Sequence, residues 1–208
     1  MADKQMERFQ AECAAFFETL WTGEKRPLVF GAGLCEEPLL MLIGEAPGHQ
    51  EAMQGKPFVG KAGQNLSRFL QTLGLTREEI YISNVVKLHP TRLSPAGRLV
   101  NRPPTREEQR LFQPWLMREI ALVRPRALVT LGNVPLHAFF EGSTLTVGQL
   151  HGAWRQAVVS PPDGPALTLP LYPLYHPAAI LYNRSLDAVY QEDLLRLRDS
   201  LRLPGDGA

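Results

Sequence analysis

The chain has 208 residues and a mass of 23.2 kDa, which is enough for one α/β domain with a buried core and too little for two ordinary domains and a linker. Hydrophobic residues make up 44% and charged residues 21% of it, a composition that excludes collagen-like, disordered and coiled-coil proteins. No apolar run reaches the roughly 18 residues of a membrane span, and residues 1–10 are polar and charged, unlike a secretory signal. We therefore expect a single domain over residues 1–208, located in the cytoplasm.

The net charge of +1 hides an uneven distribution of charge along the chain. Residues 1–40 hold 4 basic and 7 acidic side chains, whereas residues 84–126 hold 9 basic and 3 acidic ones. Such a basic segment is typical of a surface that meets an anionic partner. The cysteines, Cys13 and Cys35, are too few for an ordinary structural zinc or iron–sulfur site, so we expect free thiols and no metal.

Short apolar runs alternate with helical patterns along the chain. The runs predict strands at residues 39–43, 80–86, 127–131, 157–159 and 167–174, and the patterns predict helices at residues 62–74, 105–123, 134–140 and 186–201. Residues 88–104, with four prolines, are predicted to form a loop, residues 1–28 a helical extension and residues 202–208 a loose tail. The alternation predicts an α/β fold with a mainly parallel sheet that is covered on both faces.

The segment GKPFVGKA at residues 55–62 nearly spells a phosphate-binding P-loop. Ala62 stands where the magnesium-holding hydroxyl residue belongs, and residues 50–54 before the segment do not resemble a strand. Hydrolysis of a nucleoside triphosphate stays an alternative, which binding of ATP with magnesium would test.

Three polar side chains each end a different predicted strand. Glu45 follows the first strand within the turn Gly44-Glu45-Ala46-Pro47-Gly48, Asn84 ends the second strand, and His176 follows the last one. Because the carboxyl ends of parallel strands meet at one edge of a sheet, we expect the three to line one pocket. Each also has a plain structural interpretation, as part of a solvated turn or as a buried polar group with satisfied hydrogen bonds.

The chain resembles the uracil-DNA glycosylase superfamily, and within it the bacterial and archaeal branch called family 4, from about residue 29 to residue 197. Several separate motifs in the family's order carry the resemblance: residues 44–48 with Glu51, residues 55–63, residues 81–87, Asn101-Arg102-Pro103-Pro104, Arg124-Pro125 and His176-Pro177-Ala178. The resemblance implies a three-layer α/β/α domain that flips uracil out of DNA and hydrolyses its bond to deoxyribose. The P-loop-like segment is similar to the family's pyrimidine-stacking loop.

The resemblance also implies a role for each catalytic residue. Breaking the N-glycosidic bond leaves positive charge on the sugar and negative charge on the departing base, so opposite stabilisers are needed on the two sides. Glu45 would position the attacking water or steady the cationic sugar, and His176 would donate a hydrogen bond to uracil O2. The sequence leaves the protonation of His176 open, since a neutral donor and a cation both fit that role.

Recognition of the base falls to the neighbouring residues in this resemblance. Asn84 would accept from N3–H and donate to O4, a pairing that cytosine would leave mismatched. Phe58 would stack on the flipped ring, and Glu51 would lie beside the C5 edge, where it disfavours thymine. Gly44 and Ala46 would complete the base-binding site.

The expected partner is DNA that contains uracil, bound by a monomer. Residues 179–182 resemble the family's loop that pushes into the duplex gap, with Leu181 as the wedge that compensates for lost stacking. Lys87, Arg102 and Arg184 would contact phosphates, which predicts salt-sensitive binding.

One feature of family 4 is missing from the sequence. Its members usually carry a four-cysteine iron–sulfur cluster, but two ligand positions appear here as Leu88 and Phe112. Cys13 resembles an N-terminal ligand whose partner position holds Phe16, and Cys35 lies outside the pattern. We therefore expect no cluster and no cofactor, with apolar side chains packed into the space instead.

Two further alternatives keep the same fold. The enzyme would act on another deaminated base such as hypoxanthine, or the chain would be a non-catalytic DNA-binding or damage-sensing protein. The amide of Asn84 favours uracil, and the presence of Glu45 and His176 argues against a loss of turnover.

Overall fold

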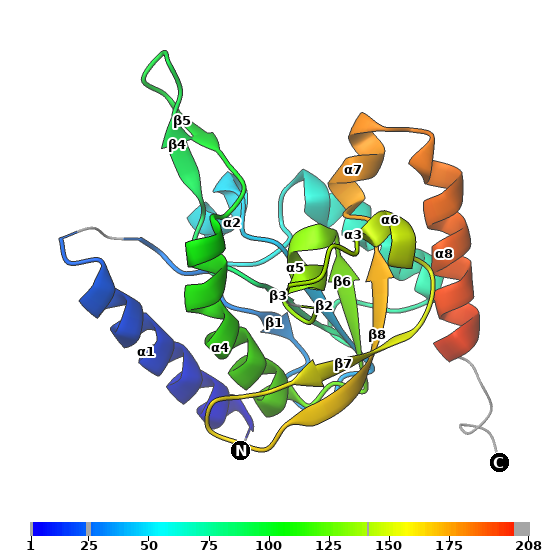
Figure 1. Ribbon diagram of the computed structural model, residues 1–208, viewed down its shortest axis with the longest axis horizontal. Coiled ribbons are helices and arrows are strands. Elements are labelled where there is room, and N and C mark those ends of the chain that lie inside the picture. The colour runs from blue at the N-terminus through cyan, green and yellow to red at the C-terminus, as the bar shows by residue number, and fades with distance from the viewer. Residues whose placement is uncertain (1, 24–25, 141, 202–208) are drawn as a thin grey trace.

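A six-stranded sheet forms the centre of the protein (Figure 1). The computed structural model describes residues 2–23, 26–140 and 142–201, and of residues 2, 61, 62 and 181 it describes the backbone. The strand order is β1-β3-β2-β6-β8-β7, with β1 Ala32–Gly33, β2 Leu40–Gly44, β3 Tyr81–Asn84, β6 Ala127–Leu131, β7 Arg155–Val159 and β8 Leu167–Leu174. The four inner strands run parallel, and β1 and β7 pair antiparallel at the two edges. The predicted, mainly parallel sheet is confirmed.

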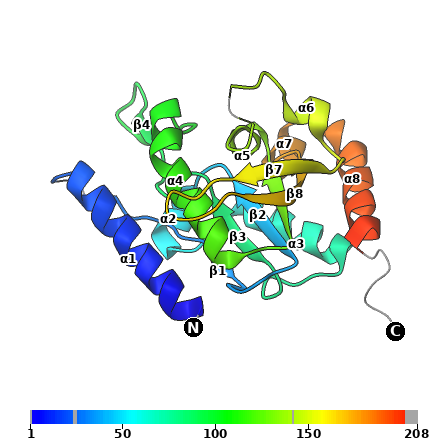
Figure 2. The same cartoon turned by 60° about the horizontal axis from the view of Figure 1, so that its bottom comes forward.

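Helices cover both faces of the sheet, which gives three layers. One face packs against α1 (Ala2–Leu20), α4 (Arg106–Val123), α5 (Asn133–His137) and α6 (Val147–Leu150), and the other against α3 (Lys61–Leu73) and α8 (Leu186–Leu201). The alternation of side chains along β2 explains the two cores, because Met41 and Ile43 enter the first and Leu40 and Leu42 the second. Figure 2 shows α1 and α4 side by side and well apart from α8.

The predicted strands and helices are all present, with shifted ends. The second strand stops at Asn84 because the next two residues leave β3 and bind the chain that follows β2. The N–H groups of Val85 and Val86 donate to the carbonyl oxygens of Gly44 and Glu45, at 2.9 and 3.1 Å. The predicted start of α4 is confirmed by its capping box, in which Thr105 and Glu108 exchange side-chain to backbone hydrogen bonds.

Three segments are more regular than the sequence patterns indicate. The predicted loop at residues 88–104 contains a β-hairpin, β4 (Thr91–Leu93) and β5 (Leu99–Asn101), whose turn is the proline- and glycine-bearing segment between them. The expected DNA-gap loop is the helix α7 (Pro177–Tyr182), and α2 (His49–Gln54) precedes the P-loop-like segment. A P-loop follows a strand, so α2 argues against that interpretation. The predicted tail at residues 202–208 lies outside the described residues.

A buried ion pair joins the segment that follows β3 to α4. The side chains of Lys87 and Glu119 are both 0% exposed, and Nζ lies 2.5 Å from Oε2. Lys87 Nζ also donates to Ser83 Oγ and to the carbonyl oxygen of Asn84, each at 2.7 Å. Glu119 accepts from the hydroxyls of Tyr81 (3.0 Å) and Ser83 (2.8 Å). Every N–H of the ammonium group is therefore used, which is what a buried charge requires.

Aromatic side chains hold α1 against α4. The ring of Phe112 is fully buried and stacks on Phe17, with centroids 4.1 Å apart and an interplanar angle of 18°. Leu88 is buried in the same core. The expectation that apolar side chains pack at positions 88 and 112 is confirmed. Phe16 lies exposed at the helix surface, so the neighbouring Phe17 fills the interior.

Replacing Phe112 with alanine removes the centre of this aromatic packing. We expect the Phe112→Ala variant to lose about 3–5 kcal/mol of unfolding free energy, because the rigid α1–α4 interface leaves a cavity. Urea denaturation measures the loss, and Phe16→Ala, at an exposed position of the same interface, is the control. Equal stability of the two variants would contradict the packing.

Removing one member of the buried ion pair leaves the other member buried without its partner. We expect Lys87→Met to cost about 3–5 kcal/mol of unfolding free energy, because the buried carboxyl group of Glu119 is left without its partner. The double variant Lys87→Met/Glu119→Leu removes both charges and is expected to recover much of that loss. A double variant no more stable than the single one in urea would show that the network matters as a whole and the charge does not.

Candidate active site

The polar residues that end the parallel strands lie at one edge of the sheet. Gly44 and Asn84 are direct partners in the register of β2 and β3. His176 lies two residues beyond β8 and caps α7. The structure thus brings together the residues that the sequence placed at separate strand ends.

A cavity of about 370 Å³ opens at this edge, within the usual size of small-molecule sites. It combines an aromatic ring, an amide and an imidazole with a turn of small residues. Its lining consists of Ala46, Pro47, Gly48, His49, Gln50, Glu51, Phe58, Gly60, Asn84, Asn101 and His176. Four of the five residues predicted to bind the base, Ala46, Glu51, Phe58 and Asn84, are among them.

Gly44 does not line the cavity but lies behind two residues that do, Asn84 and Phe58. A Cβ atom at this position would lie 2.4 Å from Asn84 Oδ1 and 2.6 Å from Phe58 Cζ. Both distances are far inside van der Waals contact, so any side chain would push the amide and the ring away. Glycine is required here because the side chains of Asn84 and Phe58 approach the same strand end.

Phe58 is held in an unusual backbone conformation. Its φ is +52°, a left-handed value that is costly for a residue with a side chain. Arg77 offsets the cost of this conformation, because its guanidinium donates to the carbonyl oxygens of Phe58 (2.7 Å) and Pro57 (2.9 Å). The sequence did not indicate a role for Arg77, because nothing in its neighbourhood signals a contact with a loop 19 residues away.

Glu51 ties α2 to the same loop. Its buried carboxylate accepts the N–H of Gly60 at 2.9 Å, and a Cβ on Gly48 would lie 2.8 Å from Oε2. This geometry explains the glycines on either side of Glu51. Discrimination against thymine by Glu51 stays a prediction.

His176 is oriented by the backbone of α7. Its Nδ1 accepts the N–H of Ala178 at 3.1 Å. Because a backbone N–H can only donate, Nδ1 is unprotonated and Nε2 carries the ring proton. Burial lowers the pKa of His176, which also favours the neutral ring. The question that the sequence leaves open is answered in favour of a neutral donor.

Glu45 lies in an adjoining cavity of about 230 Å³. His176 and Asn101 line both cavities, so Glu45 faces the space next to the cavity of Asn84. The expectation that Glu45, Asn84 and His176 line one pocket is therefore wrong for Glu45, because the turn after β2 places it in the adjoining cavity. Burial raises the pKa of Glu45. The site therefore has an acidic side, formed by Glu45, and a donor side, formed by His176 and Asn84.

The predicted role of Lys87 in binding DNA is wrong. Its ammonium is fully buried and paired with Glu119, so it is closed to a phosphate. Lys87 is buried because the segment after β3 turns its side chain toward α4 and the interior of the protein. There its ammonium donates to the carbonyl oxygen of Asn84. Lys87 thus supports Asn84 from inside the protein.

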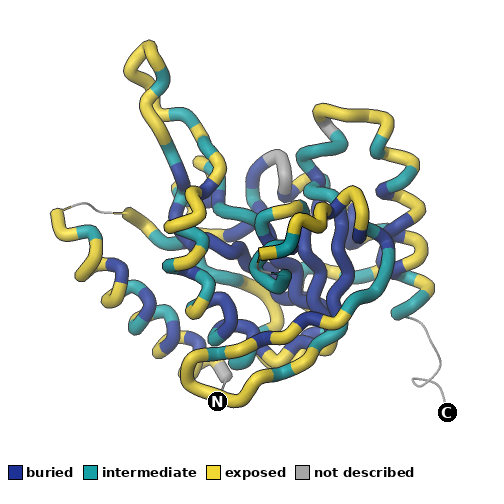
Figure 3. Tube along the Cα trace, viewed as in Figure 1, coloured by how far each residue is buried: buried dark blue, intermediate teal, exposed yellow. Residues whose placement is uncertain are grey.

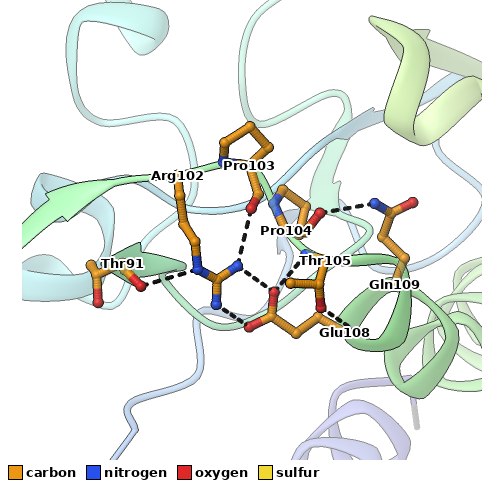
Figure 4. Close-up of polar contacts among 7 residues, drawn as sticks. All are labelled: Thr91, Arg102, Pro103, Pro104, Thr105, Glu108 and Gln109. Atoms are coloured by element: carbon orange, nitrogen blue, oxygen red, sulfur yellow. Dashed lines mark hydrogen bonds and ion pairs between the residues drawn. The ribbon is translucent and has the colours of Figure 1, made fainter. Parts of the chain in front are cut away.

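Arg102 has a structural role at the base of the hairpin. Its guanidinium forms two hydrogen bonds of 2.6 Å with the carboxylate of Glu108 and donates to the carbonyl oxygens of Thr91 and Pro103 at 3.0 Å (Figure 4). Arg102 and a backbone N–H of Thr105 lower the pKa of Glu108. A phosphate contact by Arg102 stays a prediction.

The other predicted DNA contacts lie at α7. Arg184 is exposed in the turn between α7 and α8, and its phosphate contact also stays a prediction. The side chain of Leu181 lies outside the described part of the chain. Its neighbour Tyr182 is 91% exposed, an aromatic at the surface that the sequence analysis did not single out.

The residues present do not fit an iron–sulfur cluster. Over residues 2–23, 26–140 and 142–201 no three His, Cys, Asp or Glu side chains are placed to hold a metal ion. Leu88 and Phe112, at two of the expected ligand positions, are buried apolar side chains that cannot ligate iron. Among these same residues no helix is long and apolar enough to cross a membrane.

Comparison with known proteins points to one family. The family model described as the Uracil DNA glycosylase superfamily matches residues 31–198. The type-4 uracil-DNA glycosylase of Saccharolobus solfataricus is 34% identical over 166 residues, which are 78% of this chain and 71% of that protein. That of Pyrobaculum aerophilum is 35% identical over 158 residues, 74% of each chain. A type-5 enzyme of Pyrobaculum aerophilum is 30% identical over 69% of this chain and 63% of its own. The chain belongs to the uracil DNA glycosylase superfamily.

Proposed function

We propose that this protein hydrolyses the N-glycosidic bond of uracil in DNA and leaves an abasic site for base-excision repair. The observation that carries the proposal is a neutral His176 donor and a half-buried Glu45 carboxylate at adjoining cavities, beside the amide of Asn84. The names of the relatives, type-4 uracil-DNA glycosylases, support the same activity.

The two charges that develop as the bond breaks match the two sides of the site. The departing base gains negative charge at O2, which the Nε2–H of His176, a residue that lines the cavity, stabilises by a hydrogen bond. The sugar gains positive charge, which the carboxylate of Glu45 stabilises while it orients the attacking water. Because the N–H of Ala178 holds the imidazole before the substrate arrives, little reorganisation of His176 is needed.

Selection of uracil rests on Asn84 and Phe58. The amide accepts from N3–H and donates to O4, whereas the N3 and amino group of cytosine would face the wrong partners and leave buried polar groups unpaired. Phe58 stacks on the base because Arg77 and Gly44 hold its ring against the strand end. Lys87 supports Asn84 through its carbonyl oxygen.

The proposal includes a monomer that works in the cytoplasm without a metal ion. Glu45, Asn84 and His176 line two adjoining cavities, and the proposed reaction assigns no role to a second copy of the chain. Glu45 and His176 supply the charge stabilisation that a metal would otherwise provide. Full activity in excess EDTA and a single-chain mass in light scattering are the expected results.

Excision of uracil from a labelled oligonucleotide tests the proposed reaction. We expect Glu45→Gln to lower kcat by about 10²–10⁴-fold and His176→Ala by about 10²–10³-fold, because each loses a group that acts in the transition state. Oligonucleotides with hypoxanthine or thymine in place of uracil are the controls. Cleavage at hypoxanthine would support the alternative base, and binding without any cleavage would support a non-catalytic DNA-binding protein.

The pH dependence of kcat/KM tests the protonation states. Burial raises the pKa of Glu45 and lowers that of His176, so both groups reach their active forms, carboxylate and neutral ring, as the pH rises. We expect kcat/KM to climb about tenfold per pH unit below the raised pKa of Glu45 and then to stay level through neutrality. In Glu45→Gln the part of the acid limb that belongs to Glu45 should be lost, and any limb that remains belongs to His176. A fall through neutrality as the pH rises would mean that a cationic His176 is the active form.

A further inference from the structure

The hairpin of β4 and β5 projects from the body of the protein beside the active site (Figure 1). Its turn is closed by hydrogen bonds. The N–H of Ser94 donates to the carbonyl oxygen of Arg98 at 2.8 Å, and Ser94 Oγ accepts the N–H of Arg98 at 3.1 Å. Gly97, with φ of +72°, supplies the left-handed residue of the turn. The projection is therefore a defined two-stranded ribbon.

Two leucines lie opposite each other near the tip of the hairpin. Leu93 and Leu99 are direct partners in the ladder and are 68% and 72% exposed. Figure 3 shows the hairpin as a mostly exposed segment. A cross-strand apolar pair stabilises a sheet when it is covered, so this pair forms an apolar contact surface without a cover inside the described chain.

The leucines face the active site. Side chains directly opposite each other point to one face of a ribbon, and every second residue shares that face. Thr91 and Asn101 therefore share the face of Leu93 and Leu99. Asn101 lines both the base pocket and the cavity of Glu45.

A third cavity, of about 540 Å³, continues along this face of the hairpin. It shares His89 and Arg102 with the cavity of Glu45, and Leu99 and Arg26 also line it. Its full lining is Arg26, Pro27, Ala52, Leu88, His89, Thr91, Leu99 and Arg102, without a carboxylate. A concave surface of basic and apolar character thus leads from the catalytic groups to the leucine pair.

The charge of the hairpin is positive only. Residues 88–104 contain three arginines and no aspartate or glutamate. Arg92 and Arg98 flank the leucines, and both are exposed. Within the described residues neither guanidinium forms a hydrogen bond or an ion pair. Such side chains suit the phosphates of a nucleic acid.

The base of the hairpin is anchored to the protein. The backbone N–H of Arg102 donates to the carbonyl oxygen of Pro90 at 3.1 Å, and its guanidinium clamps Thr91 to Glu108. His89 Nε2 and Asn101 Oδ1 are 2.8 Å apart. These hydrogen bonds connect the hairpin to His89, Asn101 and Arg102, which line the cavity of Glu45.

Together with the activity proposed above, on which this inference rests, we propose that the hairpin is a second DNA-binding element that enters a groove of the duplex beside the flipped uracil. Leu93 and Leu99 pack against sugars and base edges, and Arg92 and Arg98 bind phosphates. A two-stranded ribbon fits the width of the major groove, and apolar side chains offset the stacking lost when a base is flipped. With α7 and its exposed Tyr182 on the other side of the site (Figure 1), the duplex is held on both sides of the uracil.

The test compares single-stranded and duplex substrates of one sequence with one uracil. We expect Leu93→Ser/Leu99→Ser to lower kcat/KM on the duplex about tenfold or more, and on the single strand less than about threefold, because only the duplex has a groove. Val158→Ser/Leu195→Ser replaces two exposed apolar residues on β7 and α8 and is the matched control, expected to change neither value. All four positions are exposed, so thermal midpoints close to that of the wild type are expected.

The arginines are tested by salt dependence and the leucines by affinity for the product. Arg92→Gln/Arg98→Gln should reduce the slope of log K against log salt by about two for a duplex with an abasic site. The leucine variant should bind that duplex about tenfold more weakly with an unchanged slope. The abasic duplex reports on the hairpin without any need for turnover.

Each other outcome overturns one proposal. A leucine variant that equals the control on both substrates, or that loses activity equally on both, excludes groove binding by the hairpin. A wild-type dimer that the leucine substitutions dissociate would assign the pair to a second copy of the chain and exclude it as a DNA contact. A wild-type protein that excises no uracil, yet needs the leucines to bind the abasic duplex, would refute the proposed reaction and leave the hairpin's role intact.

Discussion

The buried ion pair between Lys87 and Glu119 is the interaction on which the arrangement of the site depends. Neither charge can remain in the core without the other, so the end of β3 and the middle of α4 must meet at one place. The same ammonium binds the carbonyl oxygen of Asn84. The residue that is proposed to read the base is thereby held by the interior of the protein and not by the surface of the pocket.

Burial acts in opposite directions on the two catalytic candidates. It raises the pKa of Glu45 and lowers that of His176, because an apolar environment disfavours the charged form of each. For Glu45 this makes a stronger base, and for His176 it keeps a neutral ring whose proton points away from the backbone of Ala178. Tight packing completes the site, since Gly44 leaves room for Asn84 and Phe58 to approach one strand end.

The aromatic packing between α1 and α4 stands where family 4 is expected to hold its cluster. Phe17 stacks on Phe112, and Leu88 joins their core. Leu88 also begins the segment that leads into the hairpin and pairs with Leu28 in an isolated bridge. Apolar packing at these positions therefore supports the base of the proposed DNA-binding element.

The sequence alone determined the succession of the main strands and helices along the chain, the start of α4 at Thr105, and the placing of Glu45, Asn84 and His176 at one edge of the sheet, because these follow from local periodicity and from the rule that parallel strands end at one edge. That Glu45 lines the cavity next to that of Asn84 was decided by the tertiary structure. Only the tertiary structure decided that Lys87 is buried, since a lysine after a strand has the same pattern whether it faces solvent or a carboxylate on a helix 32 residues away. The contact of Arg77 with Phe58 spans 19 residues and leaves no periodic signal. Such contacts depend on how distant segments pack, and that packing is a property of the whole chain.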